Sequence, residues 1–173
     1  MADMLVKLYQ LPDIGGRLAA LREQRIEIRR ALPAEGPVLS DWVGRHFSAA
    51  WANGCAAALV QRPITCFLAV EHGPGPTAPA GTYDLPAETL VGFACYDVAS
   101  RGMFGPTGVD PACRGRGVGA ALLVATLRAM ADEGYMYAVI GWVGPVEFYA
   151  RTVGAMLIPD SEPAGFRGPL RGD

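Results

Sequence analysis

Apolar positions recur along the chain with two different periods, which predicts an alternation of strands and helices. The clearest helix covers residues 118–133, where Ala121, Ala125 and Ala129 share one face. Residues 135–143 are apolar almost throughout, as in a strand buried on both faces. Further strands are predicted at residues 4–11, 26–28, 64–71, 89–99, 103–109 and 155–158.

The remaining segments predict shorter helices and two irregular regions. Residues 17–24 and 146–153 have the pattern of short helices. Residues 37–61 predict one helix or two, with Ser40 as a cap and Gly54 as the point of division. A Gly- and Pro-rich connection at 73–81 and a tail rich in Pro, Gly and Arg from 159 onward predict irregular structure. No linker or repeat interrupts this order, so we expect one domain over residues 1–173.

Composition and charge narrow the function classes. The chain has 173 residues, is 51% hydrophobic and has a net charge of −2, which argues against a general nucleic-acid binder. Its start is polar and no apolar run is long enough for a membrane span, so we expect neither a signal peptide nor an anchor. The four cysteines form no C-x-x-C pair and only two histidines are available, so we expect no metal site. Free thiols indicate a reducing, cytoplasmic location.

Residues 109–120, which read Val-Asp-Pro-Ala-Cys-Arg-Gly-Arg-Gly-Val-Gly-Ala, carry the most informative chemistry. They lie between a predicted strand and the strongest predicted helix. Gly115, Gly117 and Gly119 remove side chains from a tight turn and let the backbone approach an anion. The free N–H groups at the helix start favour a phosphate, and Arg114 and Arg116 add positive charge. The segment therefore predicts a pyrophosphate-binding turn.

Two other phosphate-binding motifs fit the residues less well. Gly115, Gly117 and Ala120 match a dinucleotide-binding G-x-G-x-x-A pattern, but five residues separate the first glycine from the strand. The next predicted strand also ends in Gly-Trp-Val, without the acidic residue that would hold a ribose. A Walker-type P-loop is excluded because no G-x-x-x-x-G-K-[ST] occurs.

The run at 114–119 fits the R/Q-x-x-G-x-G/A signature and resembles the GNAT superfamily of acyl-CoA-dependent N-acyltransferases. The resemblance implies an α/β (α+β) fold with a mixed, mostly antiparallel central sheet flanked by helices. It also implies two splayed central strands that hold the pantetheine arm of acetyl-CoA, here at 103–109 and 135–143. The residues that it assigns to the cofactor are Val109, Arg114, Gly115, Arg116, Gly117, Val118, Gly119 and Ala120.

The same resemblance suggests a general acid. Many family members have a tyrosine on the helix after the second splayed strand, and Tyr149 occupies that position. A phenol can protonate a departing CoA thiolate, whereas a purely structural role would bury its ring in the core. Some relatives use a carboxylate base. Glu71 is the first choice, and the residues say little to separate it from the other candidates, Glu88, Asp97 and Asp110.

Three departures from the family pattern bear on function. Trp142 stands where asparagine is common, Gly154-Ala155 replaces Gly-Phe, and the tail after Ile158 is short for the usual final pair of strands. We expect an N-acetyltransferase acting on a primary amine of a small molecule or peptide, in a homodimer that covers a free sheet edge. A non-catalytic acyl-CoA-binding or sensor domain is the alternative, and the residues do not identify the acceptor.

Overall fold

The fold is a mixed sheet of seven strands with helices on both faces, described here from a computed structural model that covers residues 1–73, 88–163 and 165. The strands are β1 (Met4–Lys7), β2 (Ile26–Arg30), β3 (Cys66–His72), β4 (Glu88–Tyr96), β5 (Met103–Val109), β6 (Tyr137–Ile140) and β7 (Met156–Leu157). The α-helices are α1 (Gly15–Glu23), α2 (Gly36–His46), α3 (Ala49–Leu59), α4 (Val118–Asp132) and α5 (Val146–Val153). Short 3₁₀ turns occur at Leu8–Gln10, Pro33–Glu35 and Pro111–Cys113.

The strand order across the sheet is β2-β3-β4-β5-β6-β1-β7. Strands β2 to β5 follow one another in sequence and pair antiparallel. The pairing between β5 and β6 is the one parallel contact among the described strands, with α4 as the crossover. The expected mixed, mostly antiparallel sheet flanked by helices is confirmed.

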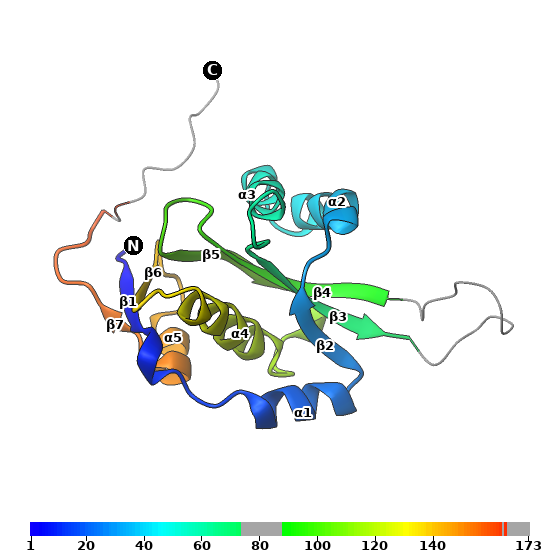
Figure 1. The fold of residues 1–173 in the computed structure, drawn as a ribbon, viewed down its shortest axis with the longest axis horizontal. Helices are drawn as coiled ribbons and strands as arrows, with labels where there is room; N and C mark the ends of the chain where they lie inside the picture. Colours follow the sequence, from blue (N-terminus) through cyan, green and yellow to red (C-terminus); the bar gives the residue numbers. More distant parts are fainter. Residues whose placement is uncertain (74–87, 164, 166–173) are drawn as a thin grey trace, which may run out of the picture.

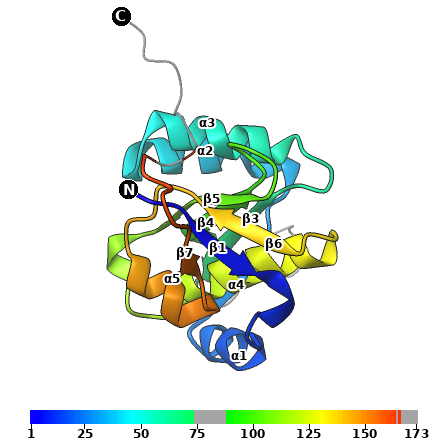
Figure 2. The same cartoon turned by 90° about the vertical axis from the view of Figure 1, so that its left-hand side faces the viewer.

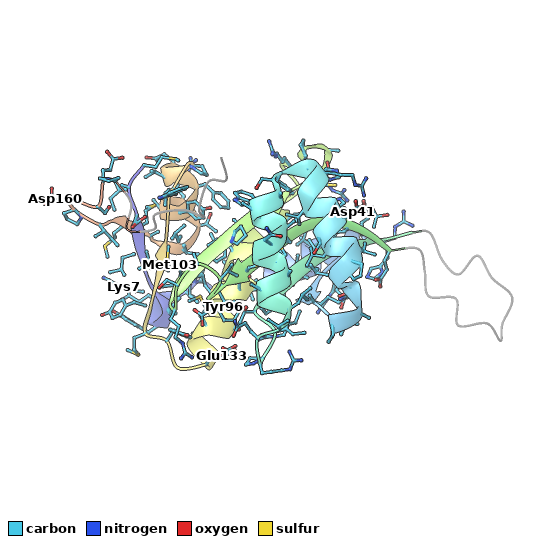
Figure 3. All side chains as sticks on the ribbon, turned by 90° about the horizontal axis from the view of Figure 1, so that it is seen from above. Lys7, Asp41, Tyr96, Met103, Glu133 and Asp160 are labelled. Carbon is cyan, nitrogen blue, oxygen red and sulfur yellow. The ribbon has the colours of Figure 1, made fainter. Side chains whose placement is uncertain are left out.

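Helices cover the two faces of the sheet unequally. Figures 1 and 2 show α2 and α3 on one face and α1, α4 and α5 on the other. Helix α4 is the centre of the larger apolar core, and its residues Ala121, Leu122, Val124 and Leu127 are fully buried. The smaller core lies between α2, α3 and the β3–β4 hairpin, around Phe93. In Figure 3, seen from their own side, α2 and α3 lie over one half of the sheet, away from β1 and β6.

The predicted helical region at 37–61 forms two helices, but they divide at a different place. Helix α2 ends at His46, and Ser48 caps α3 by accepting a hydrogen bond from the Trp51 N–H at 3.2 Å. Gly54 lies inside α3, where an added Cβ would meet Val98 at 3.2 Å, so it permits close packing and does not divide the helices. Ser40 lies inside α2 and does not cap it.

The two ends of the chain complete the sheet together. Strand β1 lies between β6 and β7, with Met4 opposite Ile140 on one side and Leu157 on the other. Among the described residues of the tail, the strand formed is the two-residue β7, within the predicted range 155–158. The predicted connection at 73–81 lies outside the described residues except for Gly73.

None of the described helices combines the length and the apolar character that a membrane-spanning segment requires. The four cysteines are buried free thiols. No cluster of metal-ligating side chains occurs within residues 1–73, 88–163 and 165.

Candidate cofactor and acyl-transfer site

The central strands β5 and β6 separate after two paired positions. Met103 lies opposite Val139 and Phe104 opposite Ile140, and no later register pair joins the two described strands. Strand β5 continues to Val109 and pairs there only with β4. The edge of β5 that faces β6 therefore has no strand partner among the described residues over 105–109, where Pro106 has no N–H and the backbone groups alternate between β4 and this open edge. Buried backbone groups need partners, so this edge can hydrogen-bond an extended ligand.

The separation has a visible cause in the chain beyond β6. After Ile140 the backbone no longer follows β5, because it hydrogen-bonds to the N-terminal segment. The Trp142 N–H donates to Asp3 Oδ1 at 3.1 Å, and the Val143 N–H donates to the Ala2 carbonyl at 3.1 Å. Asp3 is buried, and its other carboxylate oxygen accepts the Gly165 N–H at 3.0 Å. The N-terminus therefore draws the end of β6 away from β5.

The Gly-rich turn lies at the far end of this open interval. Gly115 has φ +79° and Gly117 has φ +90°, a left-handed conformation that glycine adopts without strain. Gly117 is the N-cap of α4, and no side chain caps this end of the helix. The first N–H groups of α4, from Val118 to Ala120, are free for an anion, while the side chains of Val118 and Ala120 are buried beneath. The turn therefore has the geometry of a phosphate site.

Val109 and Gly119 form the passage between the turn and β5. A Cβ at Gly119 would lie 3.5 Å from Val109 Cγ2 and 3.8 Å from Phe148 Cζ. The space above Gly119 is thus bounded by side chains from β5 and α5. The structure brings all eight predicted cofactor residues to this one end of the site.

The two arginines of the turn have different surroundings. The Arg114 side chain is exposed and makes no hydrogen bond or ion pair within the part of the chain that the structure describes. The Arg116 guanidinium instead donates to Glu71 Oε1 at 2.8 Å and to Gln24 Oε1 at 3.1 Å. Arg114 is therefore the side chain available to a phosphate, and Glu71 is engaged beside the turn, not along the open edge of β5.

Tyr149 lies at the other end of the interval, where β5 and β6 stop pairing. Its ring packs edge-on against Phe104 of β5, with centroids 6.4 Å apart, and against the neighbouring Phe148. The side chain is buried, and burial raises the pKa of its phenol above the ordinary value. Within residues 1–73, 88–163 and 165 the hydroxyl has no hydrogen-bond partner. The buried ring is what a structural tyrosine predicts, whereas a protonated phenol without a protein partner suits a proton donor to a ligand.

The other candidate bases all have partners. Glu88 pairs with Arg29 at 3.1 Å, and Asp97 accepts hydrogen bonds from the Tyr135 hydroxyl at 2.5 Å and the Gly102 N–H at 2.7 Å. Asp110 accepts the Ala112 N–H at 2.8 Å and so holds the 3₁₀ turn before the glycines. These carboxylates stabilise turns and strand ends, and none is left over as an evident base.

Aromatic side chains occur beside β5 and in the turn after β6. Phe47 lies directly on Gly108 of β5, where an added Cβ would collide with its ring, and Trp51 stacks on Phe47 with centroids 5.3 Å apart. Trp142, in the turn after β6, is 45% exposed and has φ +50°. The ring of Phe47 leaves no room for a side chain at position 108, so a glycine is required there. The sequence alone did not indicate this requirement.

Sequence reasoning missed three residues of this site: Asp3, Gln24 and Phe47. Each acts through a partner at least 60 positions away in the chain, Asp3 on Trp142, Gln24 on Arg116 and Phe47 on Gly108. No local pattern marks such pairs, so only the folded chain brings them together.

Comparisons with known proteins agree with this geometry. Residues 39–154 match the model of the acetyltransferase (GNAT) family. A GCN5-related glucosamine N-acetyltransferase region of a fungal multi-domain β-N-acetylglucosaminidase superposes with a TM-score of 0.66 at 15% identity. A GCN5-related N-acetyltransferase from Sphaerobacter thermophilus superposes with a TM-score of 0.61 at 19% identity.

Both superpositions cover 91% of this chain, but only 19% of the fungal chain and 48% of the bacterial one. They support the fold alone, and no curated protein sequence matches the chain. The family match covers more than half of the chain and contains the splayed strands, the Gly-rich turn and Tyr149. The chain belongs to the acetyltransferase (GNAT) family.

Proposed function

We propose that the protein transfers an acetyl group from acetyl-CoA to a primary amine of a small molecule or peptide. Acetyl transfer is the chemistry of its family. The choice of acetyl-CoA as donor and of an amine as acceptor is supported by the site. Its single strongest support is the open edge of β5 over residues 105–109, which runs from the bare N-terminus of α4 to Tyr149.

The order of groups along this interval matches the order of groups in acetyl-CoA. The turn from Gly115 to Gly119 offers backbone N–H groups to the pyrophosphate, and Arg114 offers charge. The pantetheine arm carries amides that can pair with the free backbone of β5. The thioester then lies toward Phe104 and Tyr149.

The proposed reaction is direct. The neutral amine nitrogen attacks the thioester carbonyl carbon, the C–N bond forms and the C–S bond breaks. The new amide nitrogen loses a proton to water, and Tyr149 donates its phenolic proton to the departing thiolate. Solvent then returns a proton to Tyr149. No covalent intermediate with the protein is needed, and orientation of the two reactants supplies much of the rate.

The first experiment is a binding comparison. Acetyl-CoA at concentrations well above its Kd should raise the melting temperature by mass action, whereas NAD should not. Isothermal titration then gives the affinity directly. Stabilisation by NAD but not by acetyl-CoA would reverse the assignment of the Gly-rich turn.

A non-catalytic acyl-CoA-binding module is the second candidate, favoured by the engagement of Glu71, Glu88 and Asp97 in other contacts. Thiol release from acetyl-CoA across a panel of amines separates the two functions. Release that depends on an amine supports the enzyme. Tight binding of acetyl-CoA with no release for polyamines, aminoglycosides, amino acids or peptide amines supports the binding module.

We further propose a cytoplasmic homodimer. Strand β7 has only two residues and ends the sheet beside β1, so a second copy could cover this edge. The buried free thiols suit a reducing compartment. Light scattering at high micromolar concentration should give twice the mass of one chain, and a monomeric mass would exclude the dimer.

A further inference from the structure

Arg116 is held by three separate elements of the fold. Its guanidinium donates to Glu71 at the end of β3, to the Gln24 side chain just after α1, and to Cys113 Sγ at 3.6 Å. Gln24 is itself oriented, because its amide nitrogen donates to the Ala20 carbonyl at 3.1 Å. Two of these partners, Glu71 and Gln24, lie far from the turn in the sequence and hold the arginine from outside the segment 109–120.

The position of Arg116 gives these contacts a consequence for the turn. It lies between Gly115 and Gly117, the two left-handed glycines that shape the phosphate site. Glycine has more backbone freedom than any other residue, so this segment has much entropy to lose when it becomes ordered. Anchoring the residue between the glycines removes part of that freedom before a ligand binds.

We infer that Glu71 and Gln24 lock the Gly-rich turn in its anion-binding conformation through Arg116, and that Glu71 is a positioning residue. This inference rests on the proposed binding of acetyl-CoA. It gives the two arginines separate tasks: Arg114 supplies charge to the phosphates, and Arg116 orders the backbone that binds them. Glu71 then acts on cofactor affinity and takes no proton from the acceptor.

The alternative is that Glu71 and Arg116 form an ordinary surface ion pair, which would contribute little to stability or to CoA affinity. The variants are chosen to distinguish such a pair from one that orders the turn. Glu71→Ala and Arg116→Ala should each raise the Kd for CoA about tenfold, the factor that corresponds to ordering roughly one residue. The double variant should be no worse than Arg116→Ala alone, because Glu71 acts only through Arg116. Arg116→Lys should resemble Arg116→Ala, since an ammonium cannot bridge Glu71, Gln24 and Cys113 together.

Two further readouts keep the result unambiguous. Amide hydrogen exchange in the cofactor-free protein should be faster across residues 115–119 in Glu71→Ala than in the wild type. With an active amine acceptor, the KM for acetyl-CoA should rise while kcat stays within about twofold. The matched control is Glu27→Ala, a carboxylate at the same end of the sheet that pairs with His72 at 3.1 Å and should leave CoA affinity unchanged.

The outcomes separate the lock from the proposed function. Unchanged CoA affinity and unchanged hydrogen exchange in Glu71→Ala would overturn the inference. It would also be overturned if adding Glu71→Ala to Arg116→Ala lowered kcat further, because Glu71 would then act as a base and not through Arg116. If the wild type binds no CoA, the proposed function fails, and the exchange measurement still decides whether Glu71 orders the turn.

Discussion

The two halves of the sheet are built in different ways. Strands β2 to β5 are neighbours in sequence, and each pairs with the next. Strands β6, β1 and β7 bring together the two ends of the chain, with Met4 opposite both Ile140 and Leu157. The site lies along the boundary, where β5 and β6 separate. The first half presents the phosphate turn after β5, and Trp142 follows β6 in the second half. Tyr149 packs on Phe104 of β5 at the boundary.

One part of the site is formed by a short stretch of sequence, and another part depends on contacts between residues far apart in the chain. The phosphate turn is made mainly of backbone, and its glycines are adjacent in sequence. The opening beside Tyr149 exists because Asp3 and Ala2 hold the chain after β6, more than 130 residues away. Variants in the phosphate turn should therefore change cofactor affinity, and variants at Tyr149 or in the contacts that hold the chain after β6 should change the chemical step.

The largest expected effect is that of Tyr149→Phe. This change removes the hydroxyl and keeps the ring against Phe104, so CoA affinity should change little while kcat falls about 10²–10⁴-fold. Because burial raises the pKa of the phenol, the acid should stay protonated further into the alkaline range than an ordinary tyrosine. The alkaline limb of the wild-type rate should be shifted upward accordingly, and the variant should lack it. Wild-type turnover in the variant, measured where chemistry limits the rate, would show that Tyr149 is structural.

Gly117→Val tests the first half. An added Cβ would meet no protein atom within 4 Å, but the backbone has φ +90°. A β-branched residue is strained there by about 1–3 kcal/mol, so the turn that presents the first N–H groups of α4 should be distorted. The Kd for CoA should rise about 100-fold or more. Gly16→Val is the control, because Gly16 also has open space and has no positive φ. An unchanged Kd in folded Gly117→Val would exclude the turn as the phosphate site.

The same division explains what the sequence could predict. Strand β5 and helix α5 have the predicted bounds, since regular apolar patterns and nearby Gly or Pro residues mark their ends. The division between α2 and α3 was wrong because Gly54 signals close packing with Pro106 of β5, a contact that local sequence does not reveal. The pairing of β1 with β6 and β7 was not foreseen either. Nothing near Met4 indicates a partner at Ile140.

Asp3→Ala tests the second half, with a smaller expected effect. It leaves the N–H groups of Trp142 and Gly165 without their acceptor, which should lower the free energy of unfolding by about 1–3 kcal/mol. The turn after β6 is then less well fixed, so kcat should fall more than CoA affinity. Asp13→Ala is the control, because within the described parts of the chain Asp13 accepts one hydrogen bond, from the exposed Gly15 N–H at 3.0 Å. A loss of CoA affinity with unchanged kcat would contradict the assignment of Asp3 to the chemical half.

The smallest effect concerns alkaline stability in the first half. Tyr96 ends β4, and its hydroxyl, labelled with its partner in Figure 3, donates to Glu133 just after α4 and accepts from Arg30 at 3.1 Å. Burial, and then the hydrogen bond to Glu133, raise the pKa of Tyr96 to about 12.

The sign of the pH dependence follows from that shift. The folded protein favours the neutral phenol, so its pKa lies above the unfolded value of about 10. The stability that Tyr96 contributes is complete below about pH 10 and is lost as the pH rises toward 12. Tyr96→Phe should be less stable than the wild type by about 0.5–1.5 kcal/mol at pH 8, because it lacks the hydrogen bonds of the hydroxyl. Above pH 10 the wild type should lose stability more steeply, by up to about 1.4 kcal/mol per pH unit, so that the stabilities of the two proteins converge.

Urea unfolding at steps from pH 8 to pH 11 measures the stability of both proteins against pH. The other tyrosines are shared by both proteins, so their contributions cancel in the difference. Parallel curves would mean that the ionisation of Tyr96 is not linked to folding.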